Sequence, residues 1–330
     1  MYLAEIATVD NKQHSKINIS SKKIFGVITH IQVYSLHDGP GLRTIVFMKG
    51  CPLKCKWCCN PECISHDIEI EFYGSKCINC GKCLEACKQM AVNPDMEVKS
   101  GFKINKELCN QCGECTKVCI TGALKPGGKV ISIEDIIKKV KKDQYFYLTS
   151  KGGLTISGGE PLYQFEFIYG LLKQSYNENI DNTLETSGFA PWKYYEKILP
   201  YLNLVFYDIK HMDSVIHKQW TNVSNKIILN NLIKLSKTGI PIIIRLPLIP
   251  QFNINEDNII KTARFIASLD NIQEVELMPF HQLGKDKYNR LSREYGLKHF
   301  ENLISDVKGR NSIQMIKNIL ETYNLNIKIG

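Results

Sequence analysis

Residues 50–58 read Gly50-Cys51-Pro52-Leu53-Lys54-Cys55-Lys56-Trp57-Cys58, with three cysteines on one short loop at the spacing C-x3-C-x2-C. Three thiolates at this spacing can hold three irons of a [4Fe–4S] cube, which leaves the fourth iron without a protein ligand. An iron with an open position can bind a substrate, as open positions do in other catalytic metal sites. The loop therefore predicts an iron–sulfur site formed by Cys51, Cys55 and Cys58.

Two simpler interpretations of this loop are a zinc site and half of an ordinary ferredoxin. Zinc loops usually carry paired C-x2-C motifs, and bacterial ferredoxins carry C-x2-C-x2-C. The x3 spacing fits neither pattern. Cys59 and Cys63 lie close by, but adjacent thiolates cannot easily reach two irons with the same loop geometry. We therefore expect both to be bystanders.

The chain has 330 residues, of which 44% are hydrophobic, enough for a sizeable core. This length suits two ordinary domains or one barrel-like domain with an insertion. The formal net charge of +9 indicates either an acidic partner such as nucleic acid or cysteines that bind iron as thiolates and so lower the charge. No run of five or more basic residues is present, and we expect no nucleic-acid partner.

The cellular compartment is predicted from the first residues and from the cysteines. The first thirty residues show no signal peptide, and no run of about 18 apolar residues predicts a membrane span. We therefore expect a cytoplasmic protein with no membrane partner. Thirteen cysteines in a reducing compartment are expected to bind metal or to do redox chemistry rather than to form disulfides.

Eight of these cysteines form two runs with the spacing C-x2-C-x2-C-x3-C, which is typical of bacterial two-cluster ferredoxins. In that arrangement the fourth cysteine of each run binds the other cluster. The spacing therefore predicts one [4Fe–4S] cluster on Cys77, Cys80, Cys83 and Cys119, and a second on Cys109, Cys112, Cys115 and Cys87. Lys88 and Ile120 stand where ferredoxins usually have proline. A structural zinc module is the alternative, and the spacing does not decide whether the clusters relay electrons or shape a partner surface.

The rest of the chain alternates strands with helices. We expect helices over 132–148 and 165–172, and strands over 44–48, 154–157, 182–186, 204–209, 240–246 and 273–278. Strands alternating with helices favour parallel βαβ units, and six of them suit an incomplete (β/α)6 barrel better than a closed eight-fold one. The fold class is thus α/β, with barrel parts at 1–70 and 129–330 and an α+β ferredoxin-like insertion at 71–128.

Glycines and charged residues follow the ends of the predicted strands. Because the carboxyl ends of parallel strands meet at one edge of a sheet, these residues should line one site. They are Gly158, Gly159, Glu160, Glu185, Thr186, Asp208, Lys210, Arg245 and His281.

In this order, the motifs of the chain resemble those of the radical S-adenosylmethionine (SAM) superfamily and, within it, of the activating enzymes of glycyl radical enzymes. The resemblance covers nearly the whole chain outside the Cys-rich segment, which is itself similar to the insertion carried by a subset of these activators. It rests on the three-cysteine loop with Asn60-Pro61-Glu62 and on the runs 38–44, 157–161, 184–188, 208–212, 245–250 and 278–281.

The resemblance implies roles for the strand-end residues. Gly158, Gly159 and Glu160 would bind the amino group of SAM, and Trp57 would pack near its adenine. The pocket would be completed by Lys210, Arg245 and His281 at the carboxylate and ribose, and by Glu185 and Asp208 on its wall. A monovalent cation near Glu185, Thr186 and Asp208 is also implied.

The resemblance further implies an activity and partners. The reduced cluster would cleave SAM to methionine and a 5′-deoxyadenosyl radical, which would take a Cα hydrogen from a glycine of a partner decarboxylase, dehydratase or lyase. Asp38 and the turn Gly39-Pro40-Gly41 would help to seat that glycine, and a flavodoxin or ferredoxin-type protein would donate electrons. Two alternatives are a radical SAM enzyme for a small molecule or another peptide, and an electron-transfer iron–sulfur protein, which leaves residues 129–330 unexplained.

Overall fold

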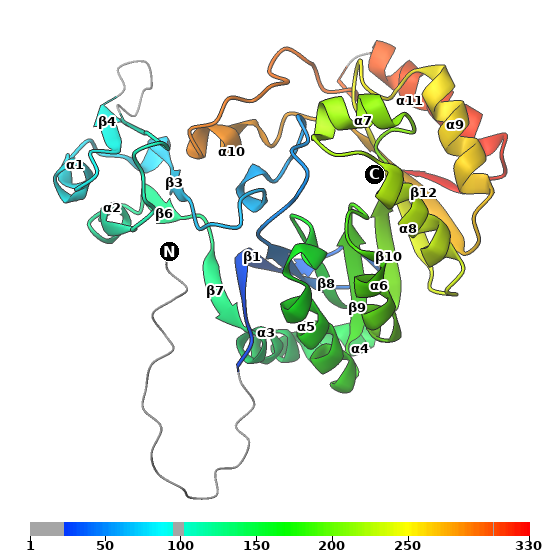
Figure 1. The fold of residues 1–330 in the computed structure, drawn as a ribbon, viewed down its shortest axis with the longest axis horizontal. Helices are drawn as coiled ribbons and strands as arrows, with labels where there is room; N and C mark the ends of the chain where they lie inside the picture. The colour runs from blue at the N-terminus through cyan, green and yellow to red at the C-terminus, as the bar shows by residue number, and fades with distance from the viewer. Residues whose placement is uncertain (1–22, 95–101, 306) are drawn as a thin grey trace, which may run out of the picture.

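The computed structural model describes residues 23–94, 102–305 and 307–330. Its core is a nine-stranded sheet in the order β13-β12-β11-β10-β9-β8-β2-β1-β7 (Figure 1). Six neighbouring strands of this sheet are parallel and follow chain order. They are β2 (Arg43–Met48), β8 (Gly153–Gly158), β9 (Asp181–Thr186), β10 (Leu204–Asp208), β11 (Ile242–Leu248) and β12 (Ile272–Pro279). The six predicted strands and the open (β/α)6 arrangement are thus confirmed.

Helices connect the parallel strands and cover one face of the sheet (Figure 1). Most of them bury an apolar face, as α5 does with Ile168, Leu171 and Leu172, whereas the buried residues of α7 are His217 and Thr221. Side-chain caps fix some of their starts, since Asp213 accepts hydrogen bonds from the first backbone N–H groups of α7. The helices are α5 (Phe165–Asn177), α6 (Trp192–Ile198), α7 (Ser214–Thr221), α8 (Lys226–Ser236), α9 (Glu256–Ala267) and α11 (Val307–Glu321).

Three strands of the sheet were not predicted. β1 (Phe25–Ser35) pairs antiparallel with β2, and β7 (Lys129–Ser132) pairs antiparallel with β1. β13 (Ile327–Ile329) adds a short parallel edge beside β12. Much of β1 is only half-buried, so its sequence lacks the continuous apolar run that marks the central strands.

The single helix expected over 132–148 is wrong. The chain forms α3 (Ile133–Val140), a 3-10 turn (Lys141–Asp143) and α4 (Gln144–Ser150) instead. The turn occurs where the buried Asp143 accepts hydrogen bonds from the hydroxyls of Tyr34 at 3.3 Å and Thr44 at 3.4 Å. These bonds tie the segment to β1 and β2.

The Cys-rich insertion forms a separate small unit beside the barrel (Figure 1). Its two ends pair as antiparallel strands, β3 (Ile70–Phe72) with β6 (Leu124–Pro126). A second pair, β4 (Val92–Pro94) with β5 (Phe102–Ile104), and two short helices, α1 (Lys82–Ala86) and α2 (Glu114–Lys117), complete it. Its apolar core is small and is formed by Ile70, Phe72, Val92, Ile104, Cys115, Ala123 and Leu124.

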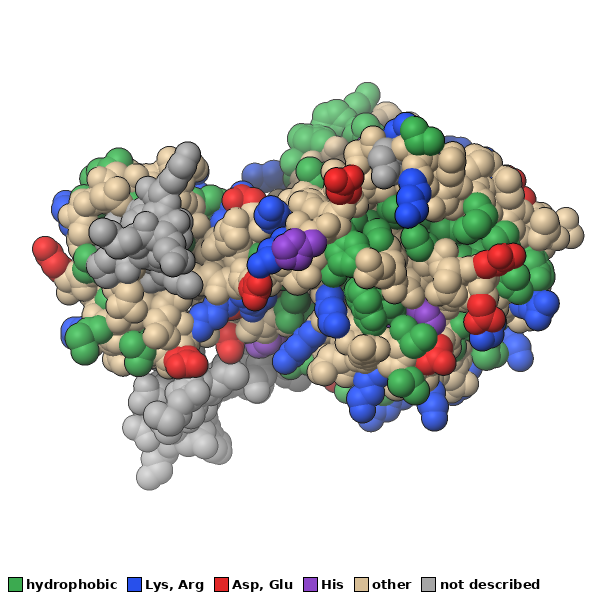
Figure 2. Space-filling view, turned by 90° about the horizontal axis from the view of Figure 1, so that it is seen from above, with side chains coloured by type: hydrophobic (Ala, Val, Ile, Leu, Met, Phe, Trp, Pro, Cys, Tyr) green, Lys and Arg blue, Asp and Glu red, His purple; other side chains and the backbone are tan. Residues whose placement is uncertain are grey.

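The junction between barrel and insertion is charged. Helix α10 (Lys285–Arg290) lies there, and Lys and Arg side chains gather along this narrower part of the molecule (Figure 2). Lys287 Nζ donates to Asn60 Oδ1 at 2.7 Å and to Glu62 Oε1 at 2.8 Å. Arg293 binds both carboxylate oxygens of Glu69 at 2.9 and 2.8 Å. The segment around α10 thereby connects the three-cysteine loop to the insertion.

Within the described residues, no helix is both long and apolar enough to span a bilayer.

Candidate functional site

A cavity of about 370 Å³ lies at the carboxyl-terminal edge of the parallel strands. This volume is in the usual range for small-molecule sites, roughly 300–1,000 Å³. The cavity collects the three cysteines and all but one of the residues predicted to contact SAM. Those residues are Trp57, Gly158, Gly159, Glu185, Thr186, Asp208, Lys210, Arg245 and His281.

The three-cysteine loop follows β2 and forms one wall. Gly50 starts it at φ +97°, where a Cβ would meet the ring of Tyr163 at 2.5 Å, so the turn requires glycine. Burial raises the pKa of the Cys51 thiol to about 12 and that of Cys55 to about 11. It also raises the pKa of Cys58 well above its usual value. Such thiols lose their protons when a metal cation takes the place of the protons. The donor set therefore fits a three-ligand iron–sulfur cube.

The two extra cysteines lie in different surroundings. Cys59 is exposed and also lines the cavity. Cys63 is buried away from the cavity wall, with its Sγ 3.6 Å from the hydroxyl of Thr29. Cys59 thus shares the cavity with the three predicted ligand cysteines and Cys63 does not, and the bystander role of both stays a prediction.

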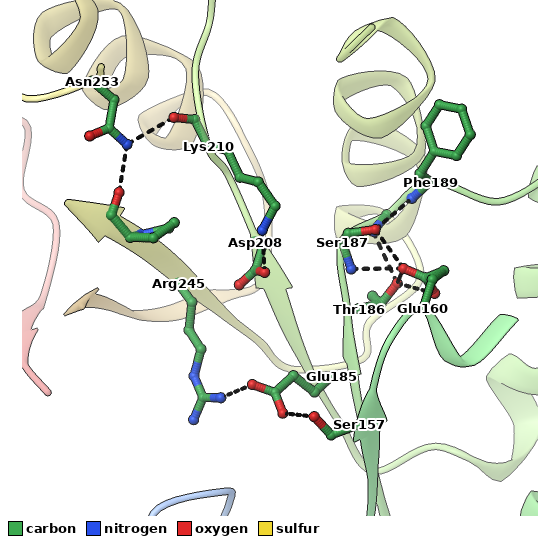
Figure 3. Close-up of polar contacts among 12 residues, drawn as sticks. Ser157, Glu160, Glu185, Thr186, Ser187, Phe189, Asp208, Lys210, Arg245 and Asn253 are labelled. Atoms are coloured by element: carbon green, nitrogen blue, oxygen red, sulfur yellow. Dashed lines mark hydrogen bonds and ion pairs between the residues drawn. The ribbon is translucent and has the colours of Figure 1, made fainter. Parts of the chain in front are cut away.

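Asp208 and Lys210 form an ion pair on the wall formed by β10 (Figure 3). Lys210 Nζ lies 2.6 Å from Asp208 Oδ2, and Asn253 anchors the Lys210 carbonyl at 2.9 Å. Burial opposes the charge on Lys210, but the Asp208 carboxylate outweighs it and raises the pKa of Lys210 above its usual value. The pair places a carboxylate and an ammonium group side by side on the cavity wall.

Arg245 on β11 is held by two carboxylates, Glu276 on the neighbouring strand β12 and Glu185 on β9. It binds Glu185, which also contacts Ser157 (Figure 3). Its Nε donates to Glu276 Oε2 at 2.9 Å. Its Nη2 donates to the His37 carbonyl at 2.9 Å. Burial opposes ionisation, but Glu185 and Glu276 raise the pKa of Arg245. Its donors are therefore largely engaged within the protein, and it fixes Glu185 in the wall.

Glu160 is the one predicted SAM contact that does not line the cavity. Its carboxylate accepts hydrogen bonds from the Thr186 hydroxyl at 2.8 and 2.9 Å, from the Ser187 hydroxyl at 2.6 Å and from the Ser187 N–H at 2.9 Å (Figure 3). The side chain is 1% exposed. The buried oxygens of Glu160 therefore find donors inside the protein, and its contact with SAM stays a prediction.

The backbone before Glu160 reaches the cavity instead. Gly158 has φ +108°, and a Cβ there would lie 2.2 Å from the backbone nitrogen of Met48. No other residue fits this position. The wall after β8 is therefore the peptide backbone of Gly158 and Gly159.

Trp57 lies at the apolar end of the cavity. Its ring packs against Phe252, with centroids 4.8 Å apart, and lies 6.5 Å from the ring of Trp220. Only 7% of Trp57 is exposed. The residue thus belongs to the core and to the cavity wall together.

Several supporting residues were not predicted from the sequence. Arg43 is fully buried and donates to Thr155 Oγ1 at 2.7 Å and to the Pro40 carbonyl at 3.2 Å. Thr155 in turn donates to the Asp38 carbonyl at 2.7 Å, so the pair holds the turn after Asp38. The motif 38–44 contains Arg43, but only its burial reveals this role. The supporting roles of Glu276 and Ser187 were likewise not predicted from the sequence.

The insertion brings its eight cysteines together in the two predicted sets. One hollow is lined by Cys77, Cys80, Cys83 and Cys119, and the other by Cys87, Cys109, Cys112 and Cys115. Backbone N–H groups point at sulfur, from Ala91 to Cys87 at 3.2 Å and from Leu124 to Cys119 at 3.3 Å. Burial opposes ionisation of Cys119, but such N–H groups lower the pKa of its thiol. Both sets therefore suit thiolate ligands of iron.

Comparison with known proteins supports this assignment. Residues 108–266 match the radical SAM superfamily, and residues 76–123 match a 4Fe-4S dicluster domain. The chain is 42% identical to the (2S)-3-sulfopropanediol dehydratase activating enzyme of Klebsiella oxytoca, over 83% of this chain and 88% of that protein.

Two further relatives are activating enzymes as well. The isethionate sulfite-lyase activating enzyme of Nitratidesulfovibrio vulgaris is 39% identical over 84% of this chain and 91% of its own. The trans-4-hydroxy-L-proline dehydratase activating enzyme of Clostridioides difficile is 35% identical over 92% of this chain and 99% of its own.

The fold, the three-cysteine loop and these matches define a radical SAM enzyme with a 4Fe-4S dicluster region. Within that class, the chain belongs to the activating enzymes of glycyl radical enzymes. The family, the fold class and the enzyme class predicted from the sequence are confirmed.

Proposed function

We propose that this enzyme binds SAM in the 370 Å³ cavity and installs a radical on a glycine of a partner enzyme. The observation that carries the proposal is the gathering of Cys51, Cys55 and Cys58 with the charged strand-end residues around one cavity. When bound there, a [4Fe–4S] cluster supplies the electron that cleaves SAM into methionine and a 5′-deoxyadenosyl radical, which removes the glycine hydrogen.

The cavity walls offer complementary groups for each part of SAM. The ion pair of Asp208 with Lys210 suits the amino and carboxylate groups of the methionine part. The Gly158-Gly159 backbone lies open to the amino group, and Trp57 offers an apolar ring surface for adenine. His281 lies after β12 on the same cavity and is proposed to contact the ribose.

Arg245 and a cation site on the cavity wall have narrower proposed roles. Arg245 is engaged by Glu185 and Glu276, so we assign it first to holding Glu185, with a SAM contact as a secondary role. A monovalent cation is proposed near Glu185, Thr186 and Asp208, where carboxylate oxygens are the suitable ligands. The Thr186 hydroxyl already donates to Glu160 and lies 3.0 Å from both the Gly188 nitrogen and the Tyr195 hydroxyl, so the two carboxylates are the main proposed ligands.

The insertion is proposed to hold two further [4Fe–4S] clusters on the two cysteine sets. The partner is proposed to be a glycyl radical enzyme of the dehydratase, lyase or decarboxylase type, because the relatives activate such enzymes. Its glycine would approach the turn after Asp38, which Thr155 and Arg43 hold in place.

The test is anaerobic reaction of the iron-loaded enzyme with SAM, a reductant and candidate partner enzymes. We expect 5′-deoxyadenosine together with a glycyl-radical doublet in electron paramagnetic resonance, and neither product with Cys58→Ala. Cleavage of SAM without the doublet, across partners of all three types, would favour a small-molecule or other peptide substrate. Absence of cleavage by the fully loaded enzyme would leave an electron-transfer role.

A further inference from the structure

A second hollow, of about 500 Å³, touches the three-cysteine loop from outside the SAM cavity. Among the described residues, Cys55 alone lines both the SAM cavity and this hollow. The other walls of this hollow are formed by residues from the loop and from the segment around α10, namely Lys54, Lys56, Ile64, Tyr288, Arg293, Glu294 and Gly296. A protein docked here would reach the cluster ligand Cys55 without entering the SAM cavity. We refer to this site as the Cys55 hollow.

The two residues beside Cys55 give the hollow a positive rim. The loop backbone is anchored, since Lys54 N–H donates to the Thr221 carbonyl at 2.8 Å and Lys56 N–H to the Trp220 carbonyl at 3.2 Å. Both lysine side chains are exposed, and the Lys56 ammonium lies 4.8 Å from the centre of the Trp220 ring. Neither lysine forms an ion pair with any residue in the described ranges.

The other charges around the hollow are already neutralised. Arg293 binds Glu69 and Glu294 binds Lys298. The net charge presented beside Cys55 is therefore that of Lys54 and Lys56. Surface charge of one sign next to a redox centre attracts a carrier of the opposite sign and speeds its encounter.

We propose that an acidic one-electron carrier protein docks at the Cys55 hollow and reduces the SAM-binding cluster directly, without passing its electron through the insertion. The step moves one electron: the carrier is oxidised by one electron and the cluster is reduced by one. No bond forms or breaks, and no proton is transferred. This inference rests on the proposed function, because it assumes a SAM-binding cluster on Cys51, Cys55 and Cys58.

The arrangement lets the carrier and the other two reactants bind at separate places. SAM occupies the cavity on the strand-end side, and the turn after Asp38 lines neither the cavity nor the hollow. A carrier at the hollow would therefore not displace SAM. Electron tunnelling weakens steeply with distance, and a route that ends at a cluster ligand is short.

The test uses the complete iron-loaded enzyme with SAM, and compares reduced flavodoxin with excess sodium dithionite as the electron source. The test variant is Lys54→Glu with Lys56→Glu. The matched control is Lys82→Glu with Lys88→Glu, which makes the same charge change at two exposed lysines beside Cys83 and Cys87 of the insertion. The rate of 5′-deoxyadenosine formation and the dissociation constant for flavodoxin are measured at low and high ionic strength, and the Lys54/Lys56 reversal is expected to weaken flavodoxin binding while the Lys82/Lys88 reversal leaves it unchanged.

We expect the Lys54/Lys56 reversal to slow the flavodoxin-driven rate about tenfold at low salt, and Lys54→Gln with Lys56→Gln to slow it about threefold. High salt should shrink both effects because it screens the charges. The dithionite-driven rate should stay unchanged in all variants, which also verifies that they fold and load iron.

The inference is overturned if the Lys54/Lys56 reversal leaves the flavodoxin-driven rate unchanged, or if the Lys82/Lys88 reversal slows it equally or more. The latter result would place the entry of electrons at the insertion. Failure of the unmodified enzyme to cleave SAM even with dithionite would instead contradict the proposed function.

Discussion

The barrel and the insertion both gather cysteines, but they hold them in different ways. In the barrel, one loop supplies three thiols, and strands as distant in sequence as β8 and β12 supply the other cavity walls. In the insertion, two short repeats supply all eight thiols around a small apolar core. The barrel is shaped by its sheet and large core, whereas the small apolar core of the insertion leads us to expect that it needs bound metal for stability.

The largest expected contrast comes from removing one cysteine in each region. Cys58→Ala should reduce SAM cleavage to background, because only three protein thiols would hold the proposed SAM-binding cluster. Cys80→Ala should lower iron content but keep dithionite-driven cleavage within about tenfold of the unmodified enzyme. Iron content and 5′-deoxyadenosine formation are measured for both variants. Equal loss in the two variants would show that the insertion's clusters are required for cleavage itself.

Removal of iron by a chelator should separate the regions structurally. Loss of metal should unfold the insertion, while the nine-stranded sheet stays folded. Limited proteolysis, with the fragments identified by mass, should then cut first within residues 71–128. Initial cuts in β8 to β12 would show that the sheet, too, depends on iron.

Arg245→Gln is expected to destabilise the barrel strongly. Arg245 is 5% exposed and its partner Glu276 is 5% exposed, and breaking such a buried pair costs about 3–5 kcal/mol. Denaturant unfolding measures the loss in the free energy of unfolding. Lys261→Gln removes an exposed pair with Asp257 and is the control, with an effect of about 0.5 kcal/mol or less. Similar losses in the two variants would refute a structural role for Arg245.

Glu276 should make the stability of the barrel depend on pH. Burial raises its pKa, but hydrogen bonds from Lys328 and Arg245 outweigh burial and lower the pKa of Glu276 below its usual value. A carboxyl with a lowered pKa contributes stability above its unfolded-state pKa, and this is lost as pH falls through the folded-state pKa. As the pH is lowered from about 6 to about 3, the free energy of unfolding should therefore fall more steeply for the native chain than for Glu276→Gln. Parallel curves would contradict this assignment.

The smallest effect is expected at a glycine of the insertion. Gly81 precedes α1 with φ +75° and has open space around it, so Gly81→Ala should cost only the backbone strain, about 1–2 kcal/mol. Gly296→Ala is the control, because that glycine also has open space and no left-handed φ. Thermal unfolding compares them, and equal melting temperatures would argue against strain at Gly81.

The central sheet was predictable because its strands are buried, apolar and close in sequence to the helices that follow them. β1 was missed because long parts of it are half-exposed. The break in the 132–148 helix was missed because its cause, the bonds of Asp143 to Tyr34 and Thr44, joins residues about a hundred positions apart.

The candidate site was predictable where position along the chain implies position in space. Residues after parallel strands share one edge, so Asp208, Lys210 and His281 were expected together and line the same cavity. The orientation of Glu160 was not predictable, since it depends on donors from Thr186 and Ser187 on the next strand. Arg43 likewise shows its function only through burial.

The pairing of β3 with β6 has a consequence for how this architecture arose and how it can be redesigned. Ile70 lies opposite Pro126, so the insertion leaves and rejoins the barrel at adjacent points. Entry and exit points of this kind tolerate the gain or loss of a whole module. A short hairpin grafted between residues 70 and 126 should close the chain without disturbing β1 or β7, and cluster-bearing modules of other lengths can be exchanged at the same stem.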